Sequence, residues 1–359
     1  MSYLLILLSI FIFLEILLRI IIYLKNKEFK FLGPKRKKSK IFSYSEHPYI
    51  GYCKSLNIRN NRTPSNNYGF AGTKNISKNK DKNIKRIIVC GGSTVEQNDL
   101  DQLESFDLDL TWPKKFEDCI NQEDKKYEVL NAGCSGYTIL ESLIHLITKG
   151  IHFQPDYAIL YSNINDVWMT QSLSNFKEDY SHARKHPNFP KNSRLPKWIP
   201  NIRFLFCYQY LIIFFEKYFE YPNNLTYYSQ IHKELHHTYE EIYKAKKVFK
   251  DYLKTFCGVC TSNNIIPVLI PWCFNESLVK DGSLNIDSGW DKDKFVKLLK
   301  NNNDAINEIA LEKNGVKIIN VGNLPDDCFR DKDFVHFSKK GLIKMGDIVA
   351  KNFIKIDTK

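Results

Sequence analysis

The chain has 359 residues, of which 43% are hydrophobic and 26% are charged, a composition typical of a globular protein and not of a disordered one. A chain of this length can bury a sizeable core in one or two domains. The formal net charge of +12 would suit a nucleic-acid partner, but nine of the basic residues fall within residues 1–40, against two acidic ones. No recognised nucleic-acid-binding motif accompanies this charge, so we expect no nucleic-acid partner.

The first segment of the chain is apolar. Residues Tyr3–Leu24 form a nearly continuous hydrophobic run, close to the ~20 residues that cross a bilayer. Glu15 and Arg19 interrupt it four residues apart, a spacing that lets them pair on one face of a helix. No small-residue cleavage site follows. We therefore interpret residues 1–25 as an uncleaved single-pass transmembrane anchor, and residues 26–83 as a basic juxtamembrane segment and lead-in.

Beyond the lead-in, short apolar runs alternate with longer helical patterns. We expect buried strands at Arg86–Cys90, Tyr127–Asn131, Tyr157–Tyr161, Ile265–Ile270 and Val316–Val321. Helical periodicity lies near residues 111–121, 138–149, 236–257, 292–313 and 339–355. This alternation predicts an α/β fold with a parallel sheet covered by helices on both faces. In such sheets ligands bind outside the carboxyl ends of the strands.

Residues 169–235 break this alternation. The stretch is rich in Tyr, Phe and Lys, and residues 204–215 form an aromatic and aliphatic run. We interpret it as a helical, aromatic insertion. It suits either a lid packed on the core or, over residues 203–217, a helix lying on a membrane surface.

Cysteine and histidine patterns predict no metal site. The nine cysteines form an odd, scattered set, unlike a disulfide framework. Cys257 and Cys260 have the spacing of half a zinc site, but no second pair completes it, and we interpret them as structural thiols. His232 and His236 lack the glutamate of the HExxH motif, which favours a solvated helix face. We expect neither a metal nor a cofactor.

Ser93 has the setting of a nucleophile. It follows a predicted strand directly, and Gly91 and Gly92 before it permit a tight turn and a close approach of substrate. An ordinary helix N-cap serine is the alternative. A P-loop is excluded because no Gly-Lys-Ser/Thr follows. The Gly-x-Ser-x-Gly elbow of α/β-hydrolases is also missing, both here and around Ser135.

A base and its orienting carboxylate stand near the other end of the chain. Asp333 and His336 follow the last predicted strand and precede the last predicted helix. Three residues apart in a turn, the carboxylate can accept the Nδ1 hydrogen of the imidazole and leave Nε2 to act as a base. Without Ser93, the same pair would be interpreted as a solvated loop.

Two further strand ends offer hydrogen-bond donors. Asn165 and Asp166 follow the central strand, and the Asn165 amide is placed to donate to an oxyanion. Gly133 would bring a backbone N–H close in the same way. Either group also suits plain turn chemistry, but groups at four strand ends complete the parts needed for serine-based acyl transfer.

The motif order resembles that of the SGNH (GDSL-type) hydrolases, through Gly91-Gly92-Ser93-Thr94, Asn131-Ala132-Gly133, Asn165-Asp166, Asp333-x-x-His336 and the following Ser338-Lys339-Lys340-Gly341. The resemblance implies a flavodoxin-like three-layer α/β/α sandwich with a five-stranded sheet over residues 84–357, and esterase activity without a metal. By this resemblance Ser93 is the nucleophile, His336 the base and Asp333 its orienting carboxylate. The Ser93 N–H, Gly133 and Asn165 form the oxyanion hole. The chain departs from the family pattern at Gly92, where an Asp is usual, and at Asn163, where a Gly is usual.

The function expected from this set is a serine esterase that hydrolyses O-acyl esters, O-acetyl groups among them, on an envelope or surface polysaccharide. A lipid esterase or lysophospholipase, an acyltransferase with the same triad, and a catalytically silent glycan- or lipid-binding module are the alternatives. The expected partners are an acylated carbohydrate or lipid and, through residues 3–24, a membrane. The basic flank places the domain on the cytoplasmic side, whereas an anchored hydrolase of this family favours the envelope side, so the side stays open.

Overall fold

The computed structural model describes residues 2–26, 44–59, 64–96, 110–124, 126–171, 176–183, 239–281, 292–331 and 333–358. The chain divides into two compact units. The first comprises residues 1–42 with 187–226, and the second comprises residues 43–186 with 227–359.

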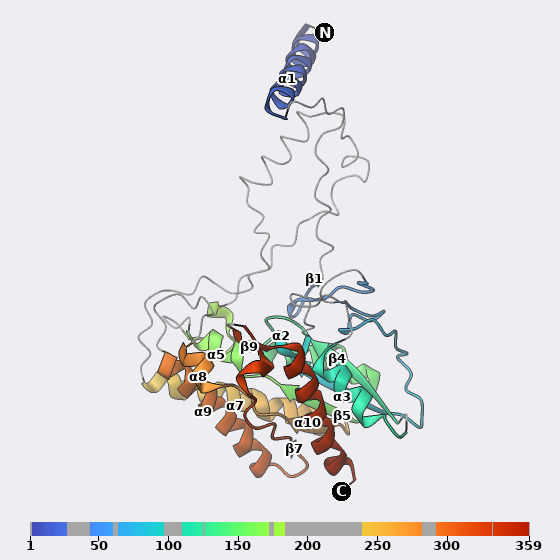
Figure 1. Ribbon diagram of the computed structural model, residues 1–359, viewed down its shortest axis with the longest axis vertical. Coiled ribbons are helices and arrows are strands. Elements are labelled where there is room, and N and C mark those ends of the chain that lie inside the picture. Colours follow the sequence, from blue (N-terminus) through green and yellow to red (C-terminus); the bar gives the residue numbers. More distant parts are fainter. Residues whose placement is uncertain are drawn as a thin grey trace. The chain divides into compact units, whose positions relative to one another are not determined.

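A five-stranded parallel sheet forms the centre of the second unit, with the strand order β4-β3-β5-β6-β7 (Figure 1). Its strands are β3 (Lys85–Gly91), β4 (Tyr127–Gly133), β5 (Tyr157–Tyr161), β6 (Ile266–Leu269) and β7 (Lys317–Ile318). All five predicted strands are present, because unbroken apolar runs suit strands that are buried on both faces. The order is that of flavodoxin-like folds, and the α/β prediction is confirmed.

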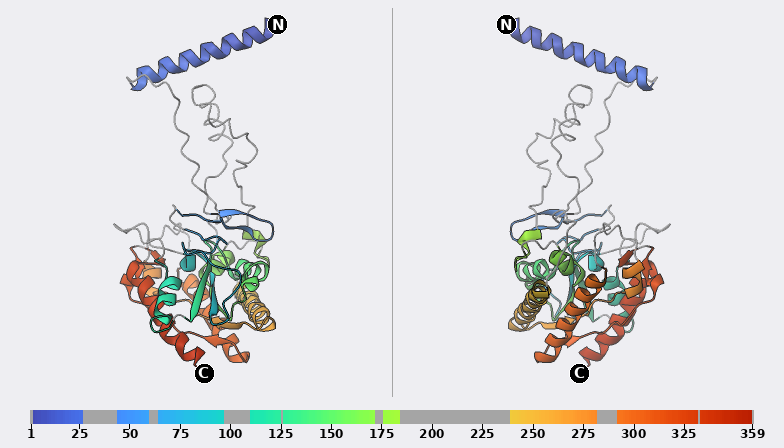
Figure 2. Two further views of the ribbon diagram at one scale, coloured as in Figure 1. Left: turned by 90° about the vertical axis from the view of Figure 1, so that its right-hand side faces the viewer. Right: turned by 90° about the vertical axis from the view of Figure 1, so that its left-hand side faces the viewer.

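Helices cover both faces of this sheet. Ile87 and Val89 of β3 pack in the cluster that contains residues of α3 (Trp112–Ile120) and α10 (Lys339–Asp357). Ile88 and Cys90 pack in the cluster that contains residues of α4 (Ile139–Thr148), α7 (Tyr239–Ser262) and the end of α9 (Lys292–Glu312). Alternate residues of one strand therefore serve two cores. Figure 2 shows the red α10 and the yellow α7 on opposite sides of the sheet.

The helices begin at residues that cap them. Thr111 accepts a hydrogen bond from the Lys114 N–H at the start of α3, and Thr138 forms a capping box with Glu141 at the start of α4. Ser338 caps α10 by accepting from the Gly341 N–H. Three short helices complete the described set, α2 (Ser93–Glu96), α5 (Ile164–Gln171) and α8 (Glu276–Asp281), with 3-10 turns at Gly150–Phe153, Ser181–Ala183 and Asp326–Cys328.

Two small antiparallel hairpins were not expected. Strands β1 (Tyr44–His47) and β2 (Gly51–Lys54) pair within the lead-in, and β8 (Phe329–Arg330) pairs with β9 (Asp333–Phe337) where a loop was expected. The strands are short, and β1 is mostly polar, so neither hairpin produces a long apolar run. Residues 43–83 of the lead-in belong to the second compact unit, and Phe70 and Ile76 are buried in its core.

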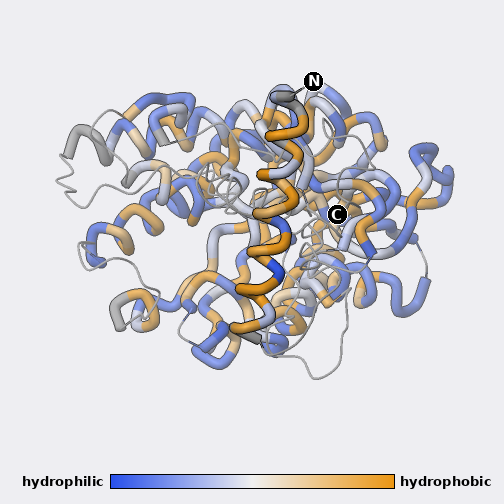
Figure 3. The backbone as a smooth tube through the Cα atoms, turned by 90° about the horizontal axis from the view of Figure 1, so that it is seen from above, coloured by the Kyte–Doolittle hydropathy of each residue, from blue (hydrophilic) through white to orange (hydrophobic). Residues whose placement is uncertain are grey.

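The predicted membrane anchor is corrected by the structure. Helix α1 (Ser2–Asn26) forms, and Figure 3 shows it as predominantly apolar. Arg19 and Glu15 pair at 2.9 Å, so two charges interrupt the apolar residues. Among the described helices, none has the length and hydropathy needed to cross a membrane. The single-pass anchor over residues 1–25, the membrane partner and the membrane localisation predicted from it are therefore wrong.

The insertion predicted at residues 169–235 is described only at its start. Residues 169–171 end α5, and residues 176–183 contain a 3-10 turn. Residues 203–217, His232 and His236 lie outside the described residues.

Candidate active site

Ser93 lies just after the carboxyl end of β3, which pairs with β4 on one side and with β5 on the other. The strand ends at Gly91, and α2 begins at Ser93 itself. The backbone of α2 is fixed by two buried side chains: Trp112 Nε1 donates to the Thr94 carbonyl at 3.0 Å, and Asn131 Nδ2 donates to the Val95 carbonyl at 2.9 Å. The Ser93 side chain is thus presented from a held turn and remains partly exposed.

His336 contacts Ser93 across 243 residues of sequence, with 2.9 Å between His336 Nε2 and Ser93 Oγ. On the other side of the ring, His336 Nδ1 lies 2.7 Å from Asp333 Oδ2. The side chains of His336 and Asp333 are 28% and 17% exposed, so substrate and water can reach the pair. The structure therefore brings together the three residues that the sequence assigns to the triad.

Asp333 is held as a carboxylate. Burial by itself would raise the pKa of Asp333, but the hydrogen bond and charge of His336 and the N–H groups of Val335 and His336 outweigh it, so the pKa lies below its usual value. Those N–H groups donate to Asp333 Oδ1 at 2.8 and 3.1 Å. An ionised carboxylate only accepts hydrogen bonds. Nδ1 of His336 therefore carries the ring hydrogen, and Nε2 accepts from the Ser93 hydroxyl.

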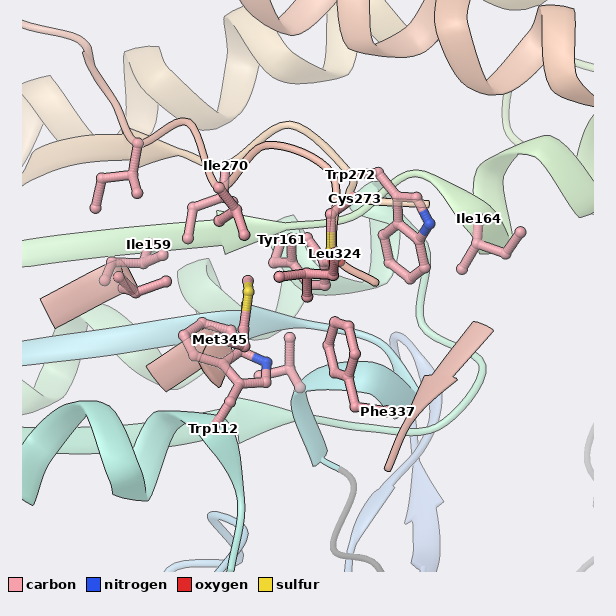
Figure 4. Packing of buried hydrophobic residues seen from close by; sticks show 14 of the residues in the cluster. Trp112, Ile159, Tyr161, Ile164, Ile270, Trp272, Cys273, Leu324, Phe337 and Met345 are labelled. Atoms are coloured by element: carbon pink, nitrogen blue, oxygen red, sulfur yellow. The ribbon is translucent and has the colours of Figure 1, made fainter. Parts of the chain in front are cut away.

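Strand β9 fixes the position of His336 through the packing of the residues next to it. Phe334 and Phe337, which precede and follow His336 in the strand, are buried, and the Phe337 ring lies 6.4 Å from the Tyr161 ring at the end of β5. Figure 4 shows Phe337, Tyr161 and Trp272 packed together, with Trp112 nearby. After Phe337, Ser338 both ends the strand and caps α10. His336 is thus fixed by core packing on both sides, which a solvated loop would not provide.

Gly133 has a different contact from the one expected. Its N–H donates to Asn131 Oδ1 at 3.0 Å, within its own strand end. A side chain at Gly133 would overlap the backbone of Val95 and Glu96 in α2. The glycine therefore allows α2 to pack directly on β4.

Asn165 lies beside Gly92, the residue before Ser93. Its Nδ2 donates to the Tyr137 carbonyl at 2.7 Å. A Cβ on Gly92 would overlap the same Asn165 nitrogen, so only a glycine at this position lets the amide approach the residue next to Ser93. This contact gives a physical reason for the departure from the family pattern at Gly92.

A second glycine near Asn165 was missed in the sequence. Residues Cys134–Tyr137 form a turn in which the Tyr137 N–H donates to the Cys134 carbonyl at 3.0 Å, and Gly136 has a φ of 81°. A positive φ at the third position is the feature of a type II turn. The Ser135 carbonyl accepts from the Tyr52 hydroxyl. Because C=O and N–H point in opposite directions across a trans peptide, the Gly136 N–H points away from Tyr52.

Two polar residues at the end of β5 are structural. Asp166 is fully buried and accepts from the Ile139 N–H at the start of α4 and from the Ser162 hydroxyl at 2.9 Å. Asn163 donates to the Leu299 carbonyl at 3.0 Å and accepts from Asn302 at 3.0 Å. The amide of Asn163 therefore attaches α9 to the sheet.

Cys257 and Cys260, which have the spacing of half a zinc site, lie in α7. Both are buried, and burial raises the pKa of Cys257 to about 11. Within the described ranges, no group of three or more His, Cys, Asp or Glu side chains is arranged to hold a metal ion.

No family model and no curated protein matches the chain. Among solved structures, it is similar to a GDSL-like lipase from Bacteroides thetaiotaomicron, with 13% identity, a TM-score of 0.42, and coverage of 78% of this chain and 93% of that one. It is also similar to a lipase/acylhydrolase from Enterococcus faecalis, with 14% identity, a TM-score of 0.42 and coverage of 76% and 97%. A third is a variant acetyl xylan esterase from Geobacillus stearothermophilus, with 13% identity, a TM-score of 0.40 and coverage of 76% and 93%. These similar structures include GDSL-type hydrolases, the family that the sequence motifs resemble. At these sequence identities, the similarity concerns the fold alone.

Proposed function

We propose that the chain is a serine hydrolase that cleaves carboxylic esters through an acyl-enzyme. The observation that carries this proposal is the unbroken series of contacts from Ser93 Oγ to His336 Nε2 at 2.9 Å and from His336 Nδ1 to Asp333 Oδ2 at 2.7 Å. A nucleophile, a base and a group that orients the base, all within hydrogen-bond reach, are the requirements for nucleophilic acyl transfer.

The reaction proceeds in two halves. Ser93 Oγ attacks the ester carbonyl carbon while its proton passes to His336 Nε2, and the bond to the alcohol breaks as His336 returns that proton to the leaving oxygen. Water then attacks the acyl-Ser93 ester, gives a proton to His336, and releases the acid as Ser93 recovers its hydrogen. Asp333 keeps the imidazole in one tautomer and stabilises its cation in both halves.

Backbone and amide donors near Ser93 would stabilise the tetrahedral oxyanion. Asn165 is supported by its approach to Gly92, and the Ser93 N–H belongs to the same turn. Gly133 was the expected third donor, but its N–H already binds Asn131. We therefore favour the Gly136 N–H, which the turn directs away from Tyr52. Removing one donor of this kind typically costs about 10²–10³ in kcat.

Short acyl groups are the favoured substrates. Tyr161 and Trp272 stack with their ring centroids 4.6 Å apart, and Phe337 packs beside them, so the described side chains beneath His336 are closely packed. All three rings are buried in the core and so present no exposed apolar surface to a long acyl chain. We propose O-acetyl or similarly small O-acyl esters on a polysaccharide as the substrate class, with a lipid ester as the second candidate.

The test is hydrolysis of p-nitrophenyl esters of increasing chain length by purified wild type and Ser93→Ala. We expect the acetyl ester to have the highest kcat/KM and Ser93→Ala to lose at least about 10³-fold in kcat. An unchanged rate in Ser93→Ala would overturn the proposal. A panel of O-acetylated sugars then tests the substrate class. Product analysis with an added acceptor sugar separates transfer from hydrolysis, since both use the same residues. Absence of hydrolysis and transfer alike would favour the silent binding module.

A further inference from the structure

A buried ion pair lies behind the nucleophile and has no part in the reaction just described. Glu96 ends α2, three residues after Ser93, and its side chain is fully buried. It pairs with Lys54 of β2, whose side chain is 2% exposed. A buried ion pair is tolerated only when hydrogen bonds from neighbouring groups satisfy both charges. The residues that bind this pair therefore indicate what it does.

The partners of Glu96 come from the lead-in hairpin and from the turn that contains Gly136. The Tyr44 hydroxyl of β1 donates to both carboxylate oxygens, at 2.8 and 2.9 Å, and the Ser135 N–H donates to Oε2. Burial, followed by the charge of Glu96, raises the pKa of Tyr44, so its hydroxyl keeps the hydrogen that it donates. One carboxylate thus joins α2, the β1–β2 hairpin and the turn at Ser135.

The same hairpin holds the other side of that turn. The Tyr52 hydroxyl donates to the Ser135 carbonyl, and the Tyr137 hydroxyl donates to the Tyr52 carbonyl at 2.6 Å. Ser135 is therefore held at its N–H by Glu96 and at its C=O by Tyr52. Because the Ser135 carbonyl and the Gly136 N–H belong to one planar peptide, fixing the first fixes the direction of the second.

We propose that Lys54, Glu96 and Tyr52 are positioning residues that set the Gly136 N–H relative to Ser93, which makes the β1–β2 hairpin part of the catalytic apparatus. This inference rests on the proposed esterase function. It assigns the lead-in, interpreted from sequence as a polar connection, a role in stabilising the oxyanion. A displacement of about 1 Å in such a site can cost about 10²-fold in rate.

Arg86 and Glu128 provide a matched control. Arg86 is buried at the opposite end of β3, and it pairs with Glu128 at 2.6 Å. Glu96→Gln and Glu128→Gln therefore make the same chemical change: each replaces the carboxylate that pairs with a buried cation, Lys54 or Arg86, by a neutral amide. We expect both substitutions to lower the midpoint of thermal unfolding, and only Glu96→Gln to lower kcat.

The experiment measures kcat and KM with p-nitrophenyl acetate, well below each variant's unfolding midpoint. We expect Glu96→Gln and Lys54→Met to lower kcat about 10–100-fold with KM within about 3-fold. Tyr52→Phe, which keeps the ring and the charges, is expected to lower kcat about 5–10-fold. Because it removes one hydrogen bond and no charge, it should lower the unfolding midpoint less than Glu96→Gln does. Glu128→Gln should keep kcat within about 2-fold, because it lies far from Ser93.

The double variant Lys54→Met with Glu96→Gln separates positioning from stability. Removing both charges leaves no lone buried ion, so the unfolding midpoint should recover relative to either single variant. Positioning predicts that kcat nevertheless stays at least about 10-fold below wild type. Recovery of kcat together with the midpoint, or kcat within 2-fold of wild type in Tyr52→Phe, would overturn the inference. Loss of the difference between wild type and Ser93→Ala would instead overturn the esterase proposal itself.

Discussion

At the amino end of β3, Arg86 is surrounded by acceptors, whereas at the carboxyl end of the same strand Ser93 and His336 remain partly exposed. The Arg86 guanidinium contacts Glu128 and the carbonyls of Ser77, Lys78 and Phe153. The nearby Asp156 carboxylate likewise accepts hydrogen bonds from protein groups, namely the Arg86 backbone N–H and Lys80 Nζ.

Asp357 completes the amino end. It accepts from Lys85 at 2.6 Å, from Tyr127 at 2.6 Å and from Tyr157, and so attaches the last turn of α10 to three strands. At the carboxyl end, the Glu96 carboxylate also accepts hydrogen bonds from several protein groups. In the Ser93–His336–Asp333 series, by contrast, the His336 side chain is 28% exposed. Both ends use buried charge to hold backbone, and the carboxyl end also leaves Ser93 and His336 partly exposed, where the proposed reaction needs them.

Substitution of His336 should show the largest difference in kcat between changes at the two ends of β3. His336→Ala removes the base and is expected to lower kcat about 10³–10⁴-fold while the fold persists, because the ring is partly exposed. Steady-state kinetics with p-nitrophenyl acetate, alongside circular dichroism, measure both effects. Asp156→Asn is the counterpart at the amino end and should reduce stability without reducing kcat. Activity in His336→Ala within 10-fold of wild type would contradict the assignment of the base.

Gly92→Ala tests the approach of Asn165 to the nucleophile. The added Cβ would overlap Asn165 Nδ2, so we expect kcat to fall about 10–100-fold with a small change in unfolding temperature. Gly258→Ala is the control, since a Cβ on Gly258 meets no atom within 4 Å. Equal kinetics in the two variants would show that Asn165 does not need this approach.

Asp357→Asn should change stability and leave catalysis intact. Burial alone would raise the pKa of Asp357, but hydrogen bonds from Lys85, Tyr127 and Tyr157 outweigh it and lower the pKa. A carboxyl whose folded pKa is lowered stabilises the fold above its unfolded pKa, and that stabilisation is lost as pH falls through the folded value. We expect a loss of about 1–2 kcal/mol at pH 7. Urea unfolding should show the gap to wild type closing below the usual Asp pKa of about 3.9. A gap that is constant down to pH 2.5 would contradict this sign.

The smallest expected effect belongs to Cys257 and Cys260. Both thiols are buried, and burial raises the pKa of Cys257 to about 11, so little thiolate forms near neutral pH. Cys257→Ser should keep kcat within about 2-fold of wild type, because α7 lies away from the triad. Iodoacetamide should alkylate neither residue in the folded protein, as measured by mass spectrometry. Rapid alkylation with loss of activity would show that the thiols take part in function.

The central sheet and the contact of Ser93 with His336 and Asp333 were predictable because each has a local signal. Apolar runs such as Arg86–Cys90 predict a buried strand, and the strands end at the residues that carry the chemistry. The order of Ser93, Asn165, Asp333 and His336 then resembles one known family. The sequence also predicts that the apolar residues of these elements form a core, but it does not predict that Phe337 packs against Tyr161.

The rest depends on contacts between residues far apart in the sequence. No local pattern predicts that Lys54 will reach Glu96, 42 residues later, or that Asn163 will bind α9 instead of facing substrate. The contact of Gly133 was unpredictable for a related reason, since only the structure shows that its N–H donates to Asn131. The anchor was overpredicted from an apolar run in which Glu15 and Arg19 pair.

Fluorophosphonate labelling followed by peptide mass mapping tests the central claim most directly. A serine activated by His336 attacks the phosphorus and keeps the adduct, whereas ordinary serines do not react. We predict one adduct, on the peptide that contains Ser93, which disappears in Ser93→Ala and is strongly slowed in His336→Ala. An adduct on another residue, such as Ser135, or labelling that persists in Ser93→Ala, would contradict the account.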